Sequence, residues 1–372
     1  MKFRRFTKTK FLTEIGRELL GKFFERFQNK LEKARVTLPG AELADAPYYS
    51  ALARVLLAPE DLPVEMSEVL FAIDALSSEA GEDQLEAAMK KEKPPLTFAT
   101  KSSRADMAMQ VWLARPELLA RVYNEARLIR VSAFEFHGTP APADRRKTFT
   151  LPDKARHAAL VKAVDEWCQA HTRGEGTVQV GHHEIDDEHW FLVRHGDTYA
   201  RTATVEQDKP VIHYRPAKDD VVVYAPEFDE IRIHAGTKGE KELYRASFGQ
   251  YLHGDPNLFS EPKAYVLDRL RTHPDEAMSL EGFPGIKQVL LVEVELRWPG
   301  SFKDAIVKKS KDIFGSAASR KPPRKAVPDT GRVTRAKFEF LFEGETKPQT
   351  VTVKPVNELK VARHCDARLV HR

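Results

Sequence analysis

The spacing of apolar residues changes once along this chain, near residue 129, and that change most limits the folds it can adopt. Before it, apolar residues recur every three or four positions, as on one face of an amphipathic helix. After it, β-branched and aromatic residues alternate with polar ones, first in residues 129–136, as in a half-buried strand. The sequence therefore predicts an α+β protein with a helical N-terminal region, a mostly antiparallel β-rich middle and a smaller α+β C-terminal part.

The first third is predicted to be helical. Residues 11–35 carry an apolar stripe with a basic face opposite it, so one amphipathic helix is expected there. Pro116 suits the first turn of a helix, where its missing N–H costs nothing. The further helices are expected at 48–57, 65–77, 82–92, 103–114 and 116–128.

The remainder is predicted to be rich in short strands. Turn residues separate the runs, which favours an antiparallel meander. Asp153 is expected to cap a helix that ends near His171, and further helices are expected at 240–252 and 262–272. The expected strands are 177–184, 188–195, 198–206, 210–215, 220–225, 229–235, 288–298, 332–343 and 349–354, the last two forming a hairpin across Gly344.

The length of 372 residues is enough for two or three domains. The pattern predicts a helical domain at 1–128, an α+β domain with an antiparallel sheet at 129–256 and an α+β domain at 257–372. Residues 315–331 are rich in Ser, Ala, Pro and basic residues, so a flexible basic segment is expected there.

The net charge of +4 hides a strong asymmetry. Residues 1–35 carry 11 Lys and Arg against 4 Glu, a net +7, and residues 303–337 carry 11 against 3 Asp, a net +8. The rest of the chain therefore carries −11, because 4 − 7 − 8 = −11. Clustered cations favour contact with a polyanion, since they release counterions from a phosphate backbone, although charge runs also serve as solvated faces.

This asymmetry predicts a non-catalytic, nucleic-acid-associated accessory protein, a subunit of a larger complex that binds phosphates with weak sequence preference. A protein–protein scaffold and an enzyme are the alternatives. The expected nucleic-acid-binding residues are Arg4, Arg5, Lys8, Lys10, Lys308, Lys309, Lys311, Arg320, Lys321, Arg324 and Lys325.

Several classes of protein are disfavoured. No apolar run is long enough to span a membrane, and the charged N-terminus lacks the apolar core of a secretory signal, so no membrane contact and a cytoplasmic location are expected. Cys168 and Cys365 lie too far apart to indicate a disulfide framework or a zinc module. There is no glycine-rich phosphate loop, dinucleotide fingerprint or nucleophile elbow. No cofactor and no metal are therefore expected.

One motif carries the enzyme alternative. The run Phe191-Leu-Val-Arg194-His195-Gly-Asp-Thr198 resembles the strand-end motif of the histidine phosphatases, the phosphoglycerate-mutase-like family. The resemblance implies that His195 accepts a phosphoryl group and that Arg194 binds its oxygens. It covers eight residues, and the chain departs from the family after them, because residues 199–206 alternate like a strand where the family has a helix.

Two further clusters could bind a metal. Residues 181–190 hold three His and four carboxylates, but an acidic turn between two strands explains the same residues. Asp275, Glu293 and Glu295 could hold Mg²⁺ for phosphodiester hydrolysis, because alternate residues of a strand share a face. The Lys of restriction-nuclease-like sites is replaced by Glu295 in this pattern, and solvent-facing acids are the plain alternative.

Overall fold

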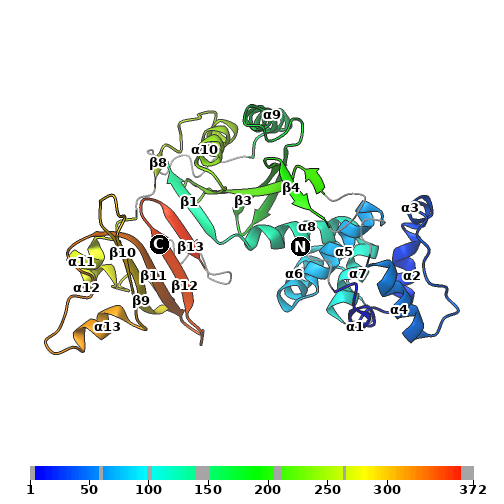
Figure 1. The fold of residues 1–372 in the computed structure, drawn as a ribbon, viewed down its shortest axis with the longest axis horizontal. Coiled ribbons are helices and arrows are strands. Elements are labelled where there is room, and N and C mark those ends of the chain that lie inside the picture. The colour runs from blue at the N-terminus through cyan, green and yellow to red at the C-terminus, as the bar shows by residue number, and fades with distance from the viewer. Residues whose placement is uncertain are drawn as a thin grey trace. The chain divides into compact units, whose positions relative to one another are not determined.

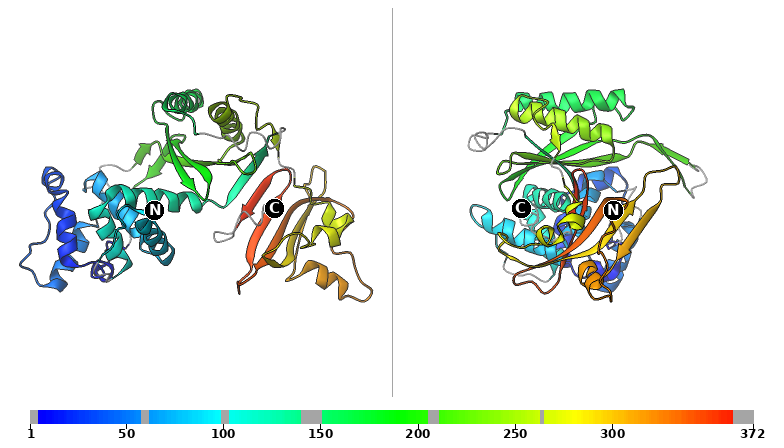
Figure 2. Two further views of the ribbon diagram at one scale, coloured as in Figure 1. Left: turned by 180° about the vertical axis from the view of Figure 1, so that it is seen from behind. Right: turned by 90° about the vertical axis from the view of Figure 1, so that its left-hand side faces the viewer.

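The structure is a computed structural model that describes residues 5–57, 62–98, 103–139, 151–204, 211–262 and 265–361. The chain divides into two compact units, residues 1–127 and 128–372 (Figures 1 and 2). The helices lie mainly in the first unit and a large antiparallel sheet lies in the second, which confirms the predicted α+β class.

The N-terminal unit is a helical bundle around one apolar core. Phe23, Leu52, Leu70 and Val111 are fully buried in this core, and Trp112 stacks on Phe27. The helices are α1 (Thr9–Leu12), α2 (Arg17–Glu25), α3 (Gln28–Lys33), α4 (Asp45–Val55), α5 (Val64–Leu76), α6 (Glu79–Lys91), α7 (Arg104–Ala114) and α8 (Pro116–Ile129).

The single helix expected at 11–35 is three short helices, α1 to α3. Helix α1 ends at Leu12 and α2 begins after Gly16, whose N–H donates to the Asp106 carboxylate at 3.3 Å. A glycine in a helix interior costs about 1 kcal/mol, which disfavours one continuous helix through Gly16. The apolar stripe is still buried, as Leu12 and Leu31 show.

The C-terminal unit is built on one eleven-stranded sheet in the order β10-β9-β11-β12-β13-β1-β7-β6-β3-β2, with β8 paired to β1. All pairings in it are antiparallel, and β4 pairs with β5 in a separate hairpin. The sheet is continuous across residue 256, and the division into three domains stays a prediction. The strands are β1 (Ala133–Gly138), β2 (Gln179–Ile185), β3 (Glu188–Gly196), β4 (Ala200–Ala203), β5 (Val211–Tyr214), β6 (Ala217–Ala225), β7 (Glu230–His234), β8 (Glu261–Pro262), β9 (Ile286–Arg297), β10 (Ala305–Lys309), β11 (Arg332–Phe342), β12 (Gln349–Lys354) and β13 (Glu358–Val361).

Two long helices, α9 (Lys154–Ala170) and α10 (Lys238–His253), lie side by side on one face of β3, β6 and β7 (Figures 1 and 2). Their apolar faces enclose a core that includes Phe191, Val222 and Phe248. Asp153 caps α9 by accepting the N–H of Arg156, as its sequence position predicts. This half of the sheet therefore has a layer of helices over a fully buried strand face.

The other end of the sheet is covered on one face by α13 (Ile313–Ala318), with α11 (Arg269–Thr272) and α12 (Pro274–Ala277) nearby (Figure 1). Ile313 and Val327 pack with Leu296 and Val333 in one core. The segment 315–331, expected to be a flexible linker, therefore begins in a helix and is held at Val327. The strands at 286–297 and 332–342 pair along their length.

A tight turn joins β2 to β3 at Asp186 and Asp187, both with positive φ (52° and 63°). Two consecutive residues in this conformation make the turn that best suits the twist of a hairpin. The acidic turn considered for this segment is therefore its structure. Among the described residues, no helix has the length and apolar character that crossing a membrane requires.

Candidate nucleic-acid interface and a buried charge network

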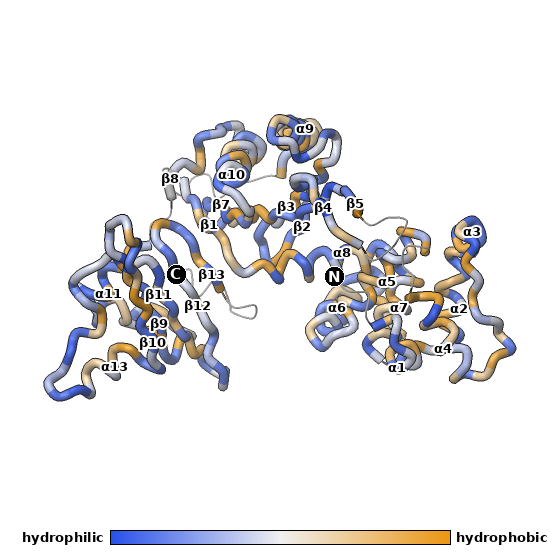
Figure 3. Tube along the Cα trace, viewed as in Figure 1, coloured by the Kyte–Doolittle hydropathy of each residue, from blue (hydrophilic) through white to orange (hydrophobic). Residues whose placement is uncertain are grey.

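The basic loop, residues 319–331, follows α13 and is the most exposed cationic segment predicted to contact phosphate. Arg320, Lys321, Arg324 and Lys325 are all exposed, and the loop is hydrophilic (Figure 3). Lys325 pairs with Asp329 at 2.5 Å across the surface. Exposed pairs of this kind are worth at most about 1 kcal/mol, so they leave the cations available to other anions.

The base of this loop is fixed. The Arg271 side chain donates to the carbonyls of Asp329 at 3.2 Å and Gly331 at 2.9 Å. The Lys308 ammonium donates to the carbonyl of Ala326 at 2.7 Å. With Val327 in the core, these contacts present the cations on an anchored loop.

The three lysines around β10 differ in surroundings. Burial, and then the charge of Arg320, lower the pKa of Lys308, which holds the loop. Lys309 points to the opposite face and pairs with Glu293 at 3.0 Å. Lys311 is exposed. The structure therefore separates three lysines that the sequence places in one basic run.

The basic residues near the N-terminus belong to the other unit. The Arg5 guanidinium pairs with Asp74 at 2.6 Å and donates to the carbonyl of Ser77 at 3.0 Å, so it fixes the N-terminal segment on α5. Lys8 and Lys10 are exposed at α1. Arg4 lies outside the described residues.

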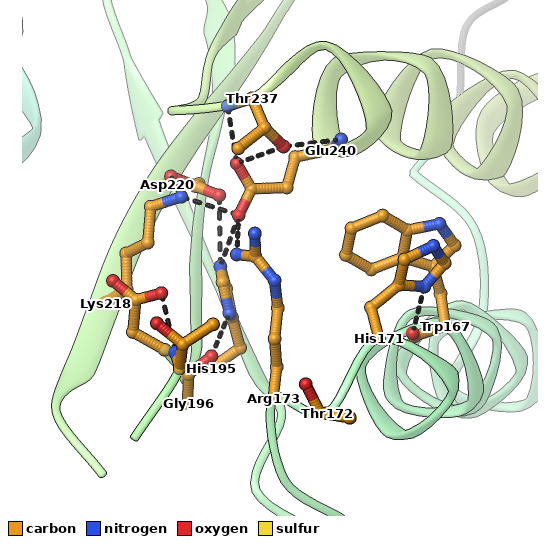
Figure 4. Close-up of polar contacts among 12 residues, drawn as sticks. Trp167, His171, Thr172, Arg173, His195, Gly196, Lys218, Asp220, Thr237 and Glu240 are labelled. Carbon is orange, nitrogen blue, oxygen red and sulfur yellow. Dashed lines mark hydrogen bonds and ion pairs between the residues drawn. The ribbon is translucent and has the colours of Figure 1, made fainter. Parts of the chain in front are cut away.

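A buried network of charged side chains lies where β3 and β6 meet α10 (Figure 4). His195 ends the apolar face of β3 that begins with Phe191 and Val193, and Lys218 lies opposite it on β6. Asp220 follows two residues later on the same face of β6. His195 and Asp220 are each 1% exposed.

The imidazole of His195 is bonded through both ring nitrogens. Nδ1 lies 2.7 Å from the carbonyl oxygen of Gly196, and Nε2 lies 3.0 Å from Oδ2 of Asp220. A carbonyl oxygen and an ionised carboxylate can only accept hydrogen bonds. Both ring nitrogens of His195 therefore donate a hydrogen bond when the ring is protonated. The Tyr244 hydroxyl of α10 donates to the same oxygen of Asp220 at 2.9 Å.

Glu240 supplies the second carboxylate from the first turn of α10. It is 0% exposed, and its Oε1 accepts from Lys218 at 2.6 Å and from the Arg173 guanidinium (Figure 4). Its Oε2 accepts from the N–H of Thr237 at 2.7 Å, while the Thr237 hydroxyl accepts the N–H of Glu240. This capping box fixes the start of α10 and the position of the charge together.

The network holds His195 in its charged form. Burial by itself lowers the pKa of His195, but the hydrogen bonds with Asp220, the Cys168 side chain and the Gly196 carbonyl more than offset burial and raise the pKa to about 10. Burial raises the pKa of Glu240, and the contacts with Lys218 and Thr237 bring it below its usual value. His195 and Glu240 are therefore both ionised at neutral pH.

The donor atoms of His195, Asp220 and Glu240 lie within 4.8 Å of one another, which is close enough to hold a metal ion. The charges around them do not fit one. Lys218 and Arg173 already neutralise Glu240, and both ring nitrogens of His195 already have protein partners, the Gly196 carbonyl and the Asp220 carboxylate. The cluster is therefore best described as a structural ion network.

The phosphatase-like motif is not assembled into a phosphate site. Arg194 and His195 are consecutive on β3 and point to opposite faces, and Arg194 makes a two-point contact with Asp219 at 2.8 and 3.2 Å. The ring of His195 is buried under α10, away from any substrate. Residues 200–203 form a strand, where the phosphatase family has a helix.

The histidine-rich hairpin brings together only part of its cluster. Nε2 of His182 lies 3.1 Å from Nδ1 of His189, and the rings stack. Burial lowers the pKa of both histidines. His183 lies opposite Trp190, so the alternation of the strand directs it to the other face.

The acid set on β9 converges on a cation. Glu293 and Glu295 are almost buried, and their carboxylates accept from the Arg335 guanidinium at 2.7 and 3.0 Å. Asp275 lies exposed on α12. Among the described residues, the one group of three or more potential metal ligands is that of His195, so the set on β9 is not one of them.

Sequence reasoning missed Arg173, Lys218, Asp220 and Glu240 as partners of His195. The alternation Phe191-x-Val193-x-His195 is a signal that places His195 on a buried face, and Thr237-x-x-Glu240 is a capping-box signal. No model of a known protein family matches the sequence, and a comparison with curated proteins finds no match either.

Proposed function

We propose that this chain is a non-catalytic, nucleic-acid-associated accessory protein that contacts the phosphate backbone. The observation that carries the proposal is the anchored basic loop, with four exposed cations against the single carboxylate of Asp329. Exposed Lys and Arg side chains that contact phosphates hold a protein in place on nucleic acid. These contacts distinguish little between base sequences. Binding is therefore expected to be strongly salt-dependent and weakly specific.

Membership of a larger complex is supported by the outer edge of the sheet. The strand β10 is the last of its sheet, so its outer backbone groups face no other strand of that sheet. Phe302 is 88% exposed just before β10, and Ile306 is 57% exposed on it. A strand of another chain can pair with an exposed sheet edge that carries apolar residues.

The proposal predicts a specific effect of loop charge. Changing Arg320, Lys321, Arg324 and Lys325 to alanine should make the slope of log affinity against log salt concentration less steep. The expected change in slope is about 0.9 per lost phosphate contact on duplex DNA and about 0.7 on a single strand. The measurement is fluorescence anisotropy of labelled duplex DNA, single-stranded DNA and RNA with the full chain, from low to moderate salt.

The matched control removes the same charge elsewhere. Lys154, Arg156, Lys162 and Lys238 are exposed on α9 and α10, and their change to alanine should leave the slope unchanged. Absence of binding by the unaltered chain at low salt would refute the proposal. A scaffold would instead bind its partner proteins equally well with and without the loop charge.

A further inference from the structure

We infer that the polar face of β9, β11, β12 and β13 is a second phosphate-binding surface, a groove that takes the backbone of a nucleic-acid strand. This inference rests on the proposed function and adds a site to it. The groove has a volume of about 560 Å³ and is lined by residues of all four strands and by Ser132, just before β1. The lining includes Arg335, Lys337 and Lys360.

The register of the sheet places these residues in rows. Lys309, Glu293, Lys337, Thr352 and Lys360 lie directly opposite one another in turn across β10, β9, β11, β12 and β13. Directly opposed residues share a face, so this row crosses five strands on one side of the sheet. A row of this length suits an extended ligand better than a compact one.

The carboxylate in the row is already neutralised. Glu293 accepts from Lys309 at 3.0 Å and from Arg335 at 2.7 Å, and Arg335 also reaches Glu295 at 3.0 Å. Arg297 pairs with Glu295 at 2.6 Å. Lys309, Arg335 and Arg297 therefore already pair with the glutamates of β9. Lys337 and Lys360 are additional positive charges.

Lys337 and Lys360 give the groove its excess positive charge. Neither forms an ion pair with another residue in the part of the chain that the structure describes. Lys337 is half-buried and Lys360 is exposed, and Thr350 and Thr352 line the groove beside them. Phosphate oxygens accept hydrogen bonds from ammonium groups and from hydroxyl groups.

The groove is separate from the basic loop. Lys308 holds the loop from one face of β10, while the neighbouring Lys309 lies on the opposite face with Glu293. Consecutive residues of a strand point to opposite sides of a sheet. The two cationic surfaces can therefore be altered independently.

The test is a pair of double variants of the full chain, Lys337→Ala with Lys360→Ala, and the control Lys287→Ala with Lys347→Ala. Both control lysines are exposed in the same unit outside the groove. Anisotropy with fluorescein-labelled oligothymidylate is measured over a salt series. We expect the groove variant to flatten the salt slope by about 1.4, two contacts at about 0.7 each, and the control to match the unaltered chain.

A second readout uses the unaltered chain. Lysine acetylation with a limiting reagent, read by mass spectrometry, should fall at Lys337 and Lys360 when the unlabelled oligonucleotide is bound, and stay constant at Lys287 and Lys347. Binding with an unchanged slope in the groove variant and no protection of the groove lysines would overturn this inference and leave the proposed function standing. No binding by the unaltered chain would overturn both.

Discussion

Replacing Glu240 by alanine should lower the melting temperature of the C-terminal unit by about 10 °C. The change leaves Arg173 and Lys218 without their carboxylate and removes the acceptor for the N–H of Thr237. Breaking a buried ion pair by removing one partner costs about 3–5 kcal/mol. In a unit of this size each kcal/mol shifts the melting temperature by about 2–4 °C.

Two further variants separate charge from capping. Glu240→Gln keeps an oxygen that can accept the Thr237 N–H but lacks the charge, so its melting temperature should fall between those of the alanine variant and the unaltered chain. Glu242→Ala is the matched control, because Glu242 lies on the same helix, is exposed and pairs only at the surface with Lys238. Thermal melting of the full chain by circular dichroism is the measurement. Equal melting temperatures for Glu240→Ala and Glu242→Ala would show that the network contributes no stability.

The second large effect is a loss of stability at alkaline pH. The pKa of His195 is about 10 in the folded protein, against about 6.5 for an unperturbed histidine. A raised folded pKa contributes stability that is complete below about pH 6.5 and is lost as the pH rises through about 10. The loss should be on the order of 3–5 kcal/mol, because each pKa unit corresponds to about 1.4 kcal/mol.

The pH effect is measured by guanidinium unfolding at pH 6 and pH 9.5. The unfolding free energy of His195→Gln should lie well below that of the unaltered chain at pH 6, and the gap should narrow at pH 9.5. His213→Gln is the control, because His213 is exposed on β5. A gap of constant size at both pH values would mean that His195 is not charged in the folded state.

Local pattern was enough to determine the types of most elements. The alternation at 188–195 predicts β3, the apolar spacing at 240–252 predicts α10, and the hairpin across Gly344 forms as expected. Asp153 caps α9 because the cap is a contact between residues three apart. Such elements can be predicted from the sequence because the residues that determine them lie within a few positions of one another.

The order of the sheet was decided by tertiary structure. The strand β1 lies between β13 and β7, so residues 133–135 pair with 358–360, more than 200 positions away. Nothing in either segment specifies its partner, because any strand with a compatible face satisfies the same backbone groups. A contact from another helix also lies at the break between α1 and α2, where Asp106 accepts the N–H of Gly16.

The sequence by itself determined where charge accumulates, and the tertiary structure decided which charges remain available. Arg5 and Lys308 are basic in sequence but serve as internal anchors, whereas Arg320 and Lys321 are exposed on a fixed loop. His195 stands in a motif typical of a phosphoryl acceptor, but the fold buries it against Asp220. Burial and pairing depend on residues 18 to 72 positions apart, so composition reveals the charge and only packing reveals its partner.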